Sequence, residues 1–188
     1  MRNSVARMAG IAVLSILGLL LCSCSPSPLD VAARGELELL AAMVEEDPSV
    51  LNYQSRKSNT KGKTPLHHAV TYGKLDVVKF LIDHEADVNL TDRTGMSPLH
   101  IASTLGRLDE AKALVRGQAN VEAMDIFGDR PLHAAAIHGR TRMIGFLIEE
   151  AKAHTGILNS EGLVPYDLAV RERKTEAANR LKELTAGE

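Results

Sequence analysis

Three segments of this chain repeat one pattern at a spacing of 33 residues, and this repeat constrains the fold more than any other feature. They read GKTPLHHAVTYGKLDVVKFLI from Gly62, GMSPLHIASTLGRLDEAKALV from Gly95 and GDRPLHAAAIHGRTRMIGFLI from Gly128. A fixed period of roughly 20 to 50 residues is typical of arrays in which each unit buries its apolar face against its neighbours. The sequence therefore predicts a solenoid.

Each unit carries the signals of a short helix. A proline suits the first helical position, because its fixed φ is already helical and its missing N–H leaves no bond unmade there. Thr64 and Ser97 precede two of the prolines as N-caps, and the histidine three residues after each cap can complete a capping box. A glycine then ends the helix in a left-handed conformation. These positions are Pro65, Pro98 and Pro131; His67, His100 and His133; and Gly73, Gly106 and Gly139.

A second helix follows in each unit, with an apolar stripe at helical period. The stripe holds Leu75, Val78 and Ile82 in the first of these units, Leu108, Ala111 and Val115 in the next, and Ile144 and Ile148 in the third. The TPLHxA helix start, the glycine within the unit and the AxVN ending resemble an ankyrin array. The resemblance implies an all-α ankyrin-repeat solenoid of about five helix-turn-helix units joined by β-hairpin-like loops.

Weaker units flank the three regular ones, so the ankyrin repeat domain is expected over residues 29–188. Residues 29–52 keep an Ala-Ala pair, Gly35 and a leucine-rich second helix. The last unit keeps Pro165 after a one-residue insertion, but Tyr166 and Asp167 replace Leu and His, and Lys182 falls where Ile148 stood. A polar outer face is what a terminal unit needs.

Some positions depart from the pattern. The glycine that usually closes the second helix is replaced by Glu85, Gln118 and Ala151. Either these turns are strained or their geometry is shifted, and Gly117 favours a shift in its unit. Arg130 and Val164 also lack the capping hydroxyl, so we expect the later units to be less stable.

Composition and motifs exclude several kinds of function. Three Phe, three Tyr, no Trp and a net charge of −2 disfavour a nucleic-acid binder. Stacked repeats set His67, His100 and His133 roughly 8 to 10 Å apart, too far to share one metal ion. No phosphate-binding, nucleophile or zinc-protease motif is present. We expect no enzymatic activity, metal, cofactor or small-molecule substrate.

The first residues read as a targeting segment. Arg2 and Arg7 precede an uncharged run from Met8 to Cys22, which is shorter than a membrane-spanning helix requires. The sequence from Leu20 to Cys24 resembles a bacterial lipobox, with Ser23 before the cysteine. The resemblance implies a lipoprotein-type signal peptide at 1–23 and a lipidated Cys24 followed by a short linker to residue 28. The protein would be exported and held on a bacterial membrane; an uncleaved anchor is the alternative.

By resemblance, a partner protein binds the concave face, at hairpin tips and at the ends of the first helices. Several of these positions are apolar, or are types enriched at interfaces. They are Tyr72, Arg93, Met96, Leu105, Ile126, Phe127, Ile137 and His138. The alternative for Leu105 and Ile137 is packing between units. Residues 56–63 hold four cations and no acid; we favour a solvated loop over contact with anionic lipid.

Two kinds of function fit this sequence. The first is a non-catalytic, lipid-anchored interaction module that holds another protein at the bacterial envelope. The alternative is an accessory stabiliser or inhibitor of an envelope enzyme. This chain is similar in that respect to some bacterial ankyrin proteins, which serve oxidative-stress enzymes. If the leader is not lipidated, a secreted or cytosolic ankyrin effector is the remaining interpretation.

Overall fold

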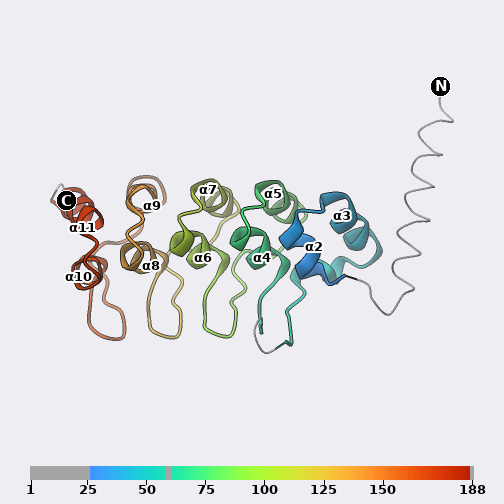
Figure 1. Ribbon diagram of the computed structural model, residues 1–188, viewed down its shortest axis with the longest axis horizontal. Helices are drawn as coiled ribbons and strands as arrows, with labels where there is room; N and C mark the ends of the chain where they lie inside the picture. The colour runs from blue at the N-terminus through green and yellow to red at the C-terminus, as the bar shows by residue number, and fades with distance from the viewer. Residues whose placement is uncertain (1–25, 58–60, 187–188) are drawn as a thin grey trace, which may run out of the picture.

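The computed structural model of the chain describes residues 26–57 and 61–186. Within them, five helix pairs stack side by side into one elongated array (Figure 1). The first helices are α2 (Pro28–Arg34), α4 (Pro65–Thr71), α6 (Pro98–Leu105), α8 (Pro131–Ile137) and α10 (Pro165–Arg171). The second helices are α3 (Leu37–Glu46), α5 (Leu75–Asp83), α7 (Leu108–Arg116), α9 (Thr141–Gly145) with its π-helical continuation η3 (Phe146–Glu150), and α11 (Thr175–Thr185). A 3-10 turn, η1 (Pro48–Asn52), follows α3.

This arrangement confirms the predicted all-α solenoid of five units. The described residues contain helices and loops but no strand, so the hairpins are loops held by a few backbone hydrogen bonds. No helix among the described residues has the length and apolar character to cross a bilayer. The predicted signal peptide at 1–23 and the predicted lipidation site Cys24 lie outside the described residues.

The core runs the length of the array as a series of leucines. Leu81, Leu114, Leu147 and Leu181 take equivalent places in their second helices, and each is at most 1% exposed. The predicted stripe residues Leu75, Ile82, Leu108 and Val115 pack against this core but stay partly exposed. Val78, Ala111 and Ile144 of the predicted stripe are 0% exposed and lie as deep as these leucines, because each second helix buries side chains against both neighbouring units.

The first helices begin as predicted where the capping side chain is present. Thr64 accepts from the N–H of His67 at 3.4 Å, and His67 Nδ1 accepts from the N–H of Thr64 at 3.1 Å. Ser97 and His100 form the same box. Arg130 and Val164 make no side-chain cap, as expected, but the Val164 N–H donates to Asp167 at 3.3 Å. Asp167 thus takes over half of the histidine's capping role.

The second helices of the second, third and fourth units are each followed by a left-handed residue, and none of these three residues is glycine. Glu85 has φ 64° and Gln118 has φ 66°. The predicted shift to Gly117 is wrong, because Gly117 has φ −78°. Ala151 is not the left-handed residue of its unit either: it is right-handed at φ −87°, and Lys152 has φ 61°.

The one-residue insertion explains that difference, and the structure places it at the end of the fourth unit's second helix. The N–H of Ala86 donates to Leu81 O at 2.9 Å, five residues back. The equivalent bond in the fourth unit runs from Ala153 to Leu147 at 2.8 Å, six residues back. The π-helical turn η3 absorbs the additional residue, so the units on either side keep their stacking.

Candidate protein-binding surface

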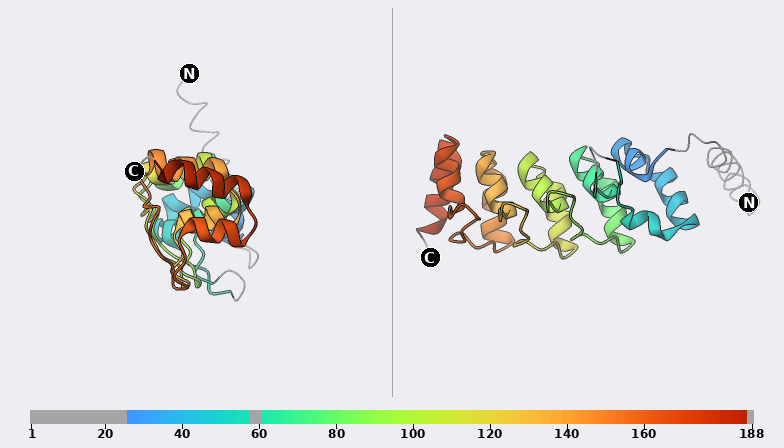
Figure 2. Two further views of the ribbon diagram at one scale, coloured as in Figure 1. Left: turned by 90° about the vertical axis from the view of Figure 1, so that its left-hand side faces the viewer. Right: turned by 90° about the horizontal axis from the view of Figure 1, so that it is seen from below.

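Helix pairs and hairpins meet at an angle, which gives the array an L-shaped cross-section seen along its length (Figure 2). The first helices and the hairpins border the inner corner of the L, and the second helices form the opposite, outer face. We call the eight residues that the sequence predicts for the concave face the concave strip. They are Tyr72, Arg93, Met96, Leu105, Ile126, Phe127, Ile137 and His138.

Most of the concave strip is open to solvent. Tyr72 is 56% exposed, Ile126 62% and Phe127 60%, although all three side chains are largely apolar. Leu105 is 40% exposed, which argues against a role only in packing between units. Arg93 and His138 are also exposed. The array therefore presents apolar side chains at the ends of two first helices and at one hairpin tip.

Two predicted members of the strip are less accessible. Met96 is half-buried and packs against the core, and Ile137 is half-buried at the end of α8. Met96 lies close in because its carbonyl oxygen accepts a hydrogen bond from His67 Nε2 at 3.0 Å, which draws its loop onto the preceding unit. For Ile137 the structure agrees in part with the packing alternative.

The hairpin that carries Ile126 and Phe127 is held in place by its own turn and by both neighbours. The Phe127 N–H donates to Asp125 Oδ1 at 2.8 Å. The Ile126 N–H donates to Thr94 O at 3.1 Å in the preceding hairpin, and Phe127 O accepts from Ser160 at 3.0 Å in the next one. Two exposed apolar side chains thus stand on a fixed backbone, which lowers the entropy lost on binding.

The repeated histidines are structural, and each joins two units. His67 Nδ1 accepts from the Thr64 N–H, so Nε2 carries the proton and donates to Met96 O. His100 Nε2 donates in the same way to Asp129 O at 3.0 Å, and His133 to Leu163 O at 3.3 Å. Burial lowers the pKa of His67 to about 4, with opposing contributions from the Met96 bond and Asp92. No metal-binding group of His, Cys, Asp or Glu is found in the described part of the chain.

Sequence reasoning missed some exposed apolar residues. Met124 is 60% exposed and extends the hairpin patch of Ile126 and Phe127. Tyr166 and Val170 on α10 are exposed, whereas their counterparts Leu66 and Val70 on α4 are fully buried. The difference arises because α4 has a following unit to pack against and α10 is the last first helix described. The place of α10 in the last repeat of the array was the sequence signal that could have predicted this exposure.

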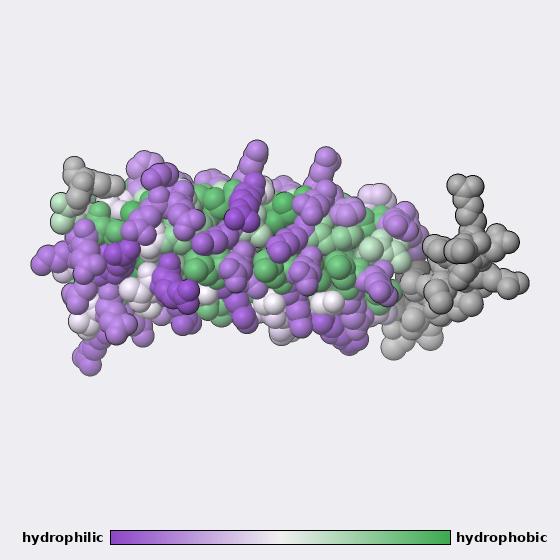
Figure 3. Space-filling model, turned by 90° about the horizontal axis from the view of Figure 1, so that it is seen from above, coloured by the Kyte–Doolittle hydropathy of each residue, from purple (hydrophilic) through white to green (hydrophobic). Residues whose placement is uncertain are grey.

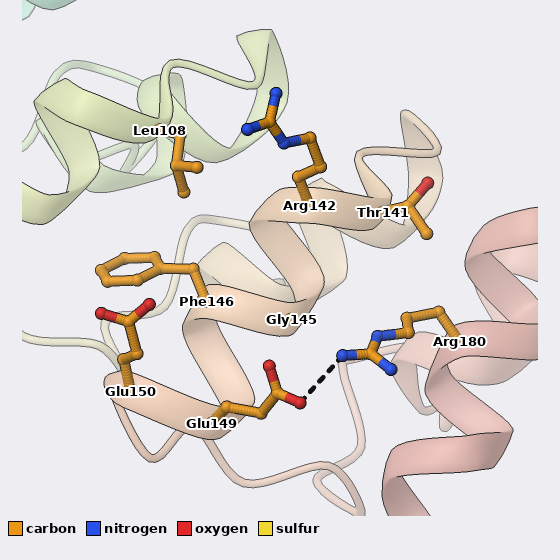
Figure 4. A pocket seen from close by; sticks show the side chains of 8 residues that line it. All are labelled: Leu108, Thr141, Arg142, Gly145, Phe146, Glu149, Glu150 and Arg180. Carbon is orange, nitrogen blue, oxygen red and sulfur yellow. Dashed lines mark hydrogen bonds and ion pairs between the residues drawn. The ribbon is translucent and has the colours of Figure 1, made fainter.

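The outer face carries charged side chains with apolar surface between them over the middle units (Figure 3). Among its hollows is a groove of about 360 Å³ beside η3, lined by residues of α7, α9, η3 and α11 (Figure 4). Arg180 and Glu149 pair across it at 2.8 Å, and Lys112 lies 5.7 Å from the centre of the Phe146 ring. These charged side chains already interact with groups of the protein itself. The groove is therefore a weaker candidate binding surface than the concave strip.

Fold and surface together define a helical repeat array with a long solvent-exposed face. The family described as "Ankyrin repeats (3 copies)" matches residues 29–125, and the family described as "Ankyrin repeat" matches residues 127–160. The chain belongs to the ankyrin repeat family. Such arrays are protein–protein interaction modules and typically non-catalytic, so this chain binds another protein. The last helix pair, α10 and α11, continues the same architecture beyond the matched residues.

Proposed function

We propose that this protein is a non-catalytic, lipid-anchored binding module of the bacterial envelope, which holds a partner protein on its concave strip. The observation that carries the proposal is the hairpin tip where Ile126 and Phe127 stand about 60% exposed on a backbone fixed by neighbouring hairpins. Apolar side chains grouped in this way mark contact surfaces. Aromatic residues at the centre of such patches supply much of the binding energy.

The anchor in this proposal is Cys24. Acylation of its thiol and of the new N-terminus would supply two or more chains, and two chains hold a protein stably on a membrane where one does not. The first helix α2 begins at Pro28, four residues later, with Ser27 as its N-cap. A tether of this length would keep the first unit next to the bilayer.

The binding half of the proposal is tested by crosslinking and pull-down of the membrane-bound protein. The test variant is Tyr72→Asp with Phe127→Asp, which places two charges in the strip at exposed positions. The matched control is Val170→Asp, an apolar residue 52% exposed at the end of the array. We expect selective loss of the partner with the double variant alone. Capture of the same proteins by wild type and double variant overturns the concave-strip assignment.

The anchoring half is tested by intact-mass analysis of the protein from cells and by fractionation of Cys24→Ala. We expect a mature chain that begins at Cys24 with added acyl mass, and release or mislocalisation of the variant. Recovery of a chain that retains an unmodified Met1 would contradict the anchoring. The identity of a selectively lost partner then separates a scaffold from an accessory of an enzyme.

A further inference from the structure

Four cations occupy one equivalent position in successive units. They stand between the first and second helix, directly after the glycine or its substitute, and each is the N-cap residue of its second helix. Arg107, Arg140 and Lys174 are exposed and Lys74 is half-buried. We call this row the basic ladder: Lys74, Arg107, Arg140 and Lys174.

Local helix chemistry disfavours this choice of residue. An N-cap position prefers Ser, Thr, Asp or Asn, and none of the four cations makes a side-chain cap hydrogen bond. The positive end of the helix dipole also repels a cation, at roughly 0.3 to 1 kcal/mol in exposed positions. A residue type that breaks the local rule four times in succession suggests a role outside helix formation.

Each ladder side chain lies over the preceding unit, where a left-handed glycine leaves room for it. A Cβ atom placed on Gly73 would lie 2.8 Å from Arg107 Nη1, and one on Gly106 would lie 3.2 Å from Arg140 Cδ. Gly35 stands in the same relation to Lys74, and Gly139 to Lys174. The four side chains therefore follow one another along the array, each beside the glycine of the preceding unit.

The clearest contact in the row belongs to Arg140. Its Nε donates to the backbone oxygen of Thr104 at 2.9 Å, near the carbonyl end of α6 in the preceding unit. That end of a helix favours a cation, which offsets part of the unfavourable cap position. The remaining guanidinium nitrogens are left to bind other groups.

Acidic residues stand in the first turns of α5, α7 and α11, but they do not pair directly with the ladder cations. Within residues 26–57 and 61–186, no ladder side chain forms an ion pair with a carboxylate, whereas Arg34, Arg171 and Arg180 all do. The first turn of α9 has no acidic residue, so Arg140 is least opposed. The pKa of His138 is lowered by burial first and then by Arg140 and Lys174, and Glu172 opposes them in part.

The spacing of the ladder specifies the geometry of a ligand. Neighbouring helices pack about 8 to 10 Å apart, so successive ladder cations are separated by about that distance. A chain in the extended polyproline II conformation has three residues per turn and rises about 3.1 Å per residue, so every third side chain lies on the same face at intervals of about 9 Å. A chain with an acidic residue at every third position therefore matches the ladder cation for cation.

We propose that the basic ladder binds an extended, acidic segment of the partner protein, with carboxylates at every third residue, alongside the concave strip. The inference rests on the proposed function and names the chemistry of the partner. A protein segment fits better than a polyphosphate, because Tyr72 and Leu105 lie two residues before Lys74 and Arg107 and offer apolar contacts to its other side chains. Opposite charges in register would fix the orientation and the association rate more than the affinity.

The test is fluorescence anisotropy with the full chain in a neutral detergent and two labelled peptides of equal composition. One peptide repeats Gly-Ser-Glu four times, and the other holds its four Glu residues in one block. We expect tighter binding of the spaced peptide in about 20 mM salt and loss of binding in about 500 mM salt. Equal binding of the two peptides overturns the proposed register.

The test variant is Arg107→Gln with Arg140→Gln, and its control is Lys79→Gln with Arg116→Gln, which removes the same charge from exposed positions on α5 and α7. We expect about tenfold weaker peptide binding for the ladder variant and less than a twofold change for the control. An equal effect of both variants means general charge attraction and overturns the ladder. The proposal is also overturned if the ladder binds oligothymidine or phosphatidylglycerol vesicles more tightly than it binds the spaced peptide.

Failure of the ladder and failure of the proposed function give different results. If the ladder variant binds the peptide normally while Tyr72→Asp with Phe127→Asp loses the cellular partner, only the ladder proposal is wrong. If both the strip variant and the ladder variant retain the cellular partner, the concave face itself is not the binding surface.

Discussion

Gln118, and not the adjacent Gly117, takes the left-handed conformation at the end of α7, with φ 66° against −78°. Gly117 is needed for a different reason. A Cβ atom on it would lie 2.8 Å from Ile82 Cγ2 in the preceding unit, a contact too short for real side chains. One residue thus provides close approach between units and the next provides the turn.

Replacing the strained residue is expected to stabilise the array. A non-glycine residue in a left-handed conformation costs roughly 1 kcal/mol, so Gln118→Gly is expected to raise the free energy of unfolding by up to about that amount. Urea unfolding followed by circular dichroism measures it. The paired variant Gly117→Ala is expected to lower stability because Ile82 must move. A stabilised Gly117→Ala would contradict the close-approach role.

The bridging histidines are expected to be among the most sensitive polar residues. His100→Ala removes a capping box, the bond to Asp129 O and buried volume, so we expect a loss of about 3 kcal/mol in the free energy of unfolding. His138→Ala, at an exposed site, is expected to change stability by less than about 0.5 kcal/mol. Similar losses for both variants in denaturant titrations would exclude the bridging role.

Stability is also expected to fall in mild acid. Burial favours the neutral ring of His67, whose pKa is about 4 when folded against 6.5 ordinarily, so below pH 6.5 the unfolded chain binds more protons. The stabilisation is complete above pH 6.5 and is lost as the pH falls toward 4, by about 3 kcal/mol from this residue. Burial lowers the pKa of His100 and His133 in the same direction.

The measurement is the free energy of unfolding at steps from pH 7.5 to 4.5. His67→Gln is the comparison, because it keeps a polar side chain that does not titrate. Its stability is expected to vary less with pH than that of the wild type. If the free energies of unfolding of the two proteins vary with pH in parallel, protonation of His67 is not a cause of the lost stability.

Deletion of Ala151 is expected to convert the π-helical turn into a regular helix end. The remaining residues read LIEEKA, which matches LIDHEA and LVRGQA at the same place in the two preceding units. We expect a folded array with the stability changed by less than about 1 kcal/mol, because Lys152 is already left-handed. Deletion of Arg116 from α7, which contains no additional residue, should unfold its unit. Thermal unfolding distinguishes the two outcomes.

The regular parts of the fold were predictable because their causes are local. Proline at the first helical position, Thr64 or Ser97 as a cap and glycine at the helix end each act within one turn of helix. Five units, their order and the structural role of the histidines follow from repetition of these signals. Tyr72 and Phe127 are exposed, at the end of a first helix and at a hairpin tip.

The parts that were not predictable depend on contacts between units. The insertion before Pro165 was visible in the spacing, but its place in η3 depends on which helix end can widen without moving the core. Met96 is half-buried because His67, 29 residues earlier, binds its carbonyl oxygen. Arg130, which lacks a capping hydroxyl, pairs instead with Glu122 at 2.9 Å. None of these partners lies within reach of a local pattern.

The histidine bridges give the array a direction. Each ring is bound to the turn of its own helix and to a carbonyl oxygen of the hairpin that follows, and none of the three reaches backward along the chain. Loss of the last unit would leave His133 without its acceptor, whereas loss of the first unit would leave every ring satisfied. We therefore expect local unfolding to propagate into the array more readily from the carboxyl-terminal end than from the amino-terminal end.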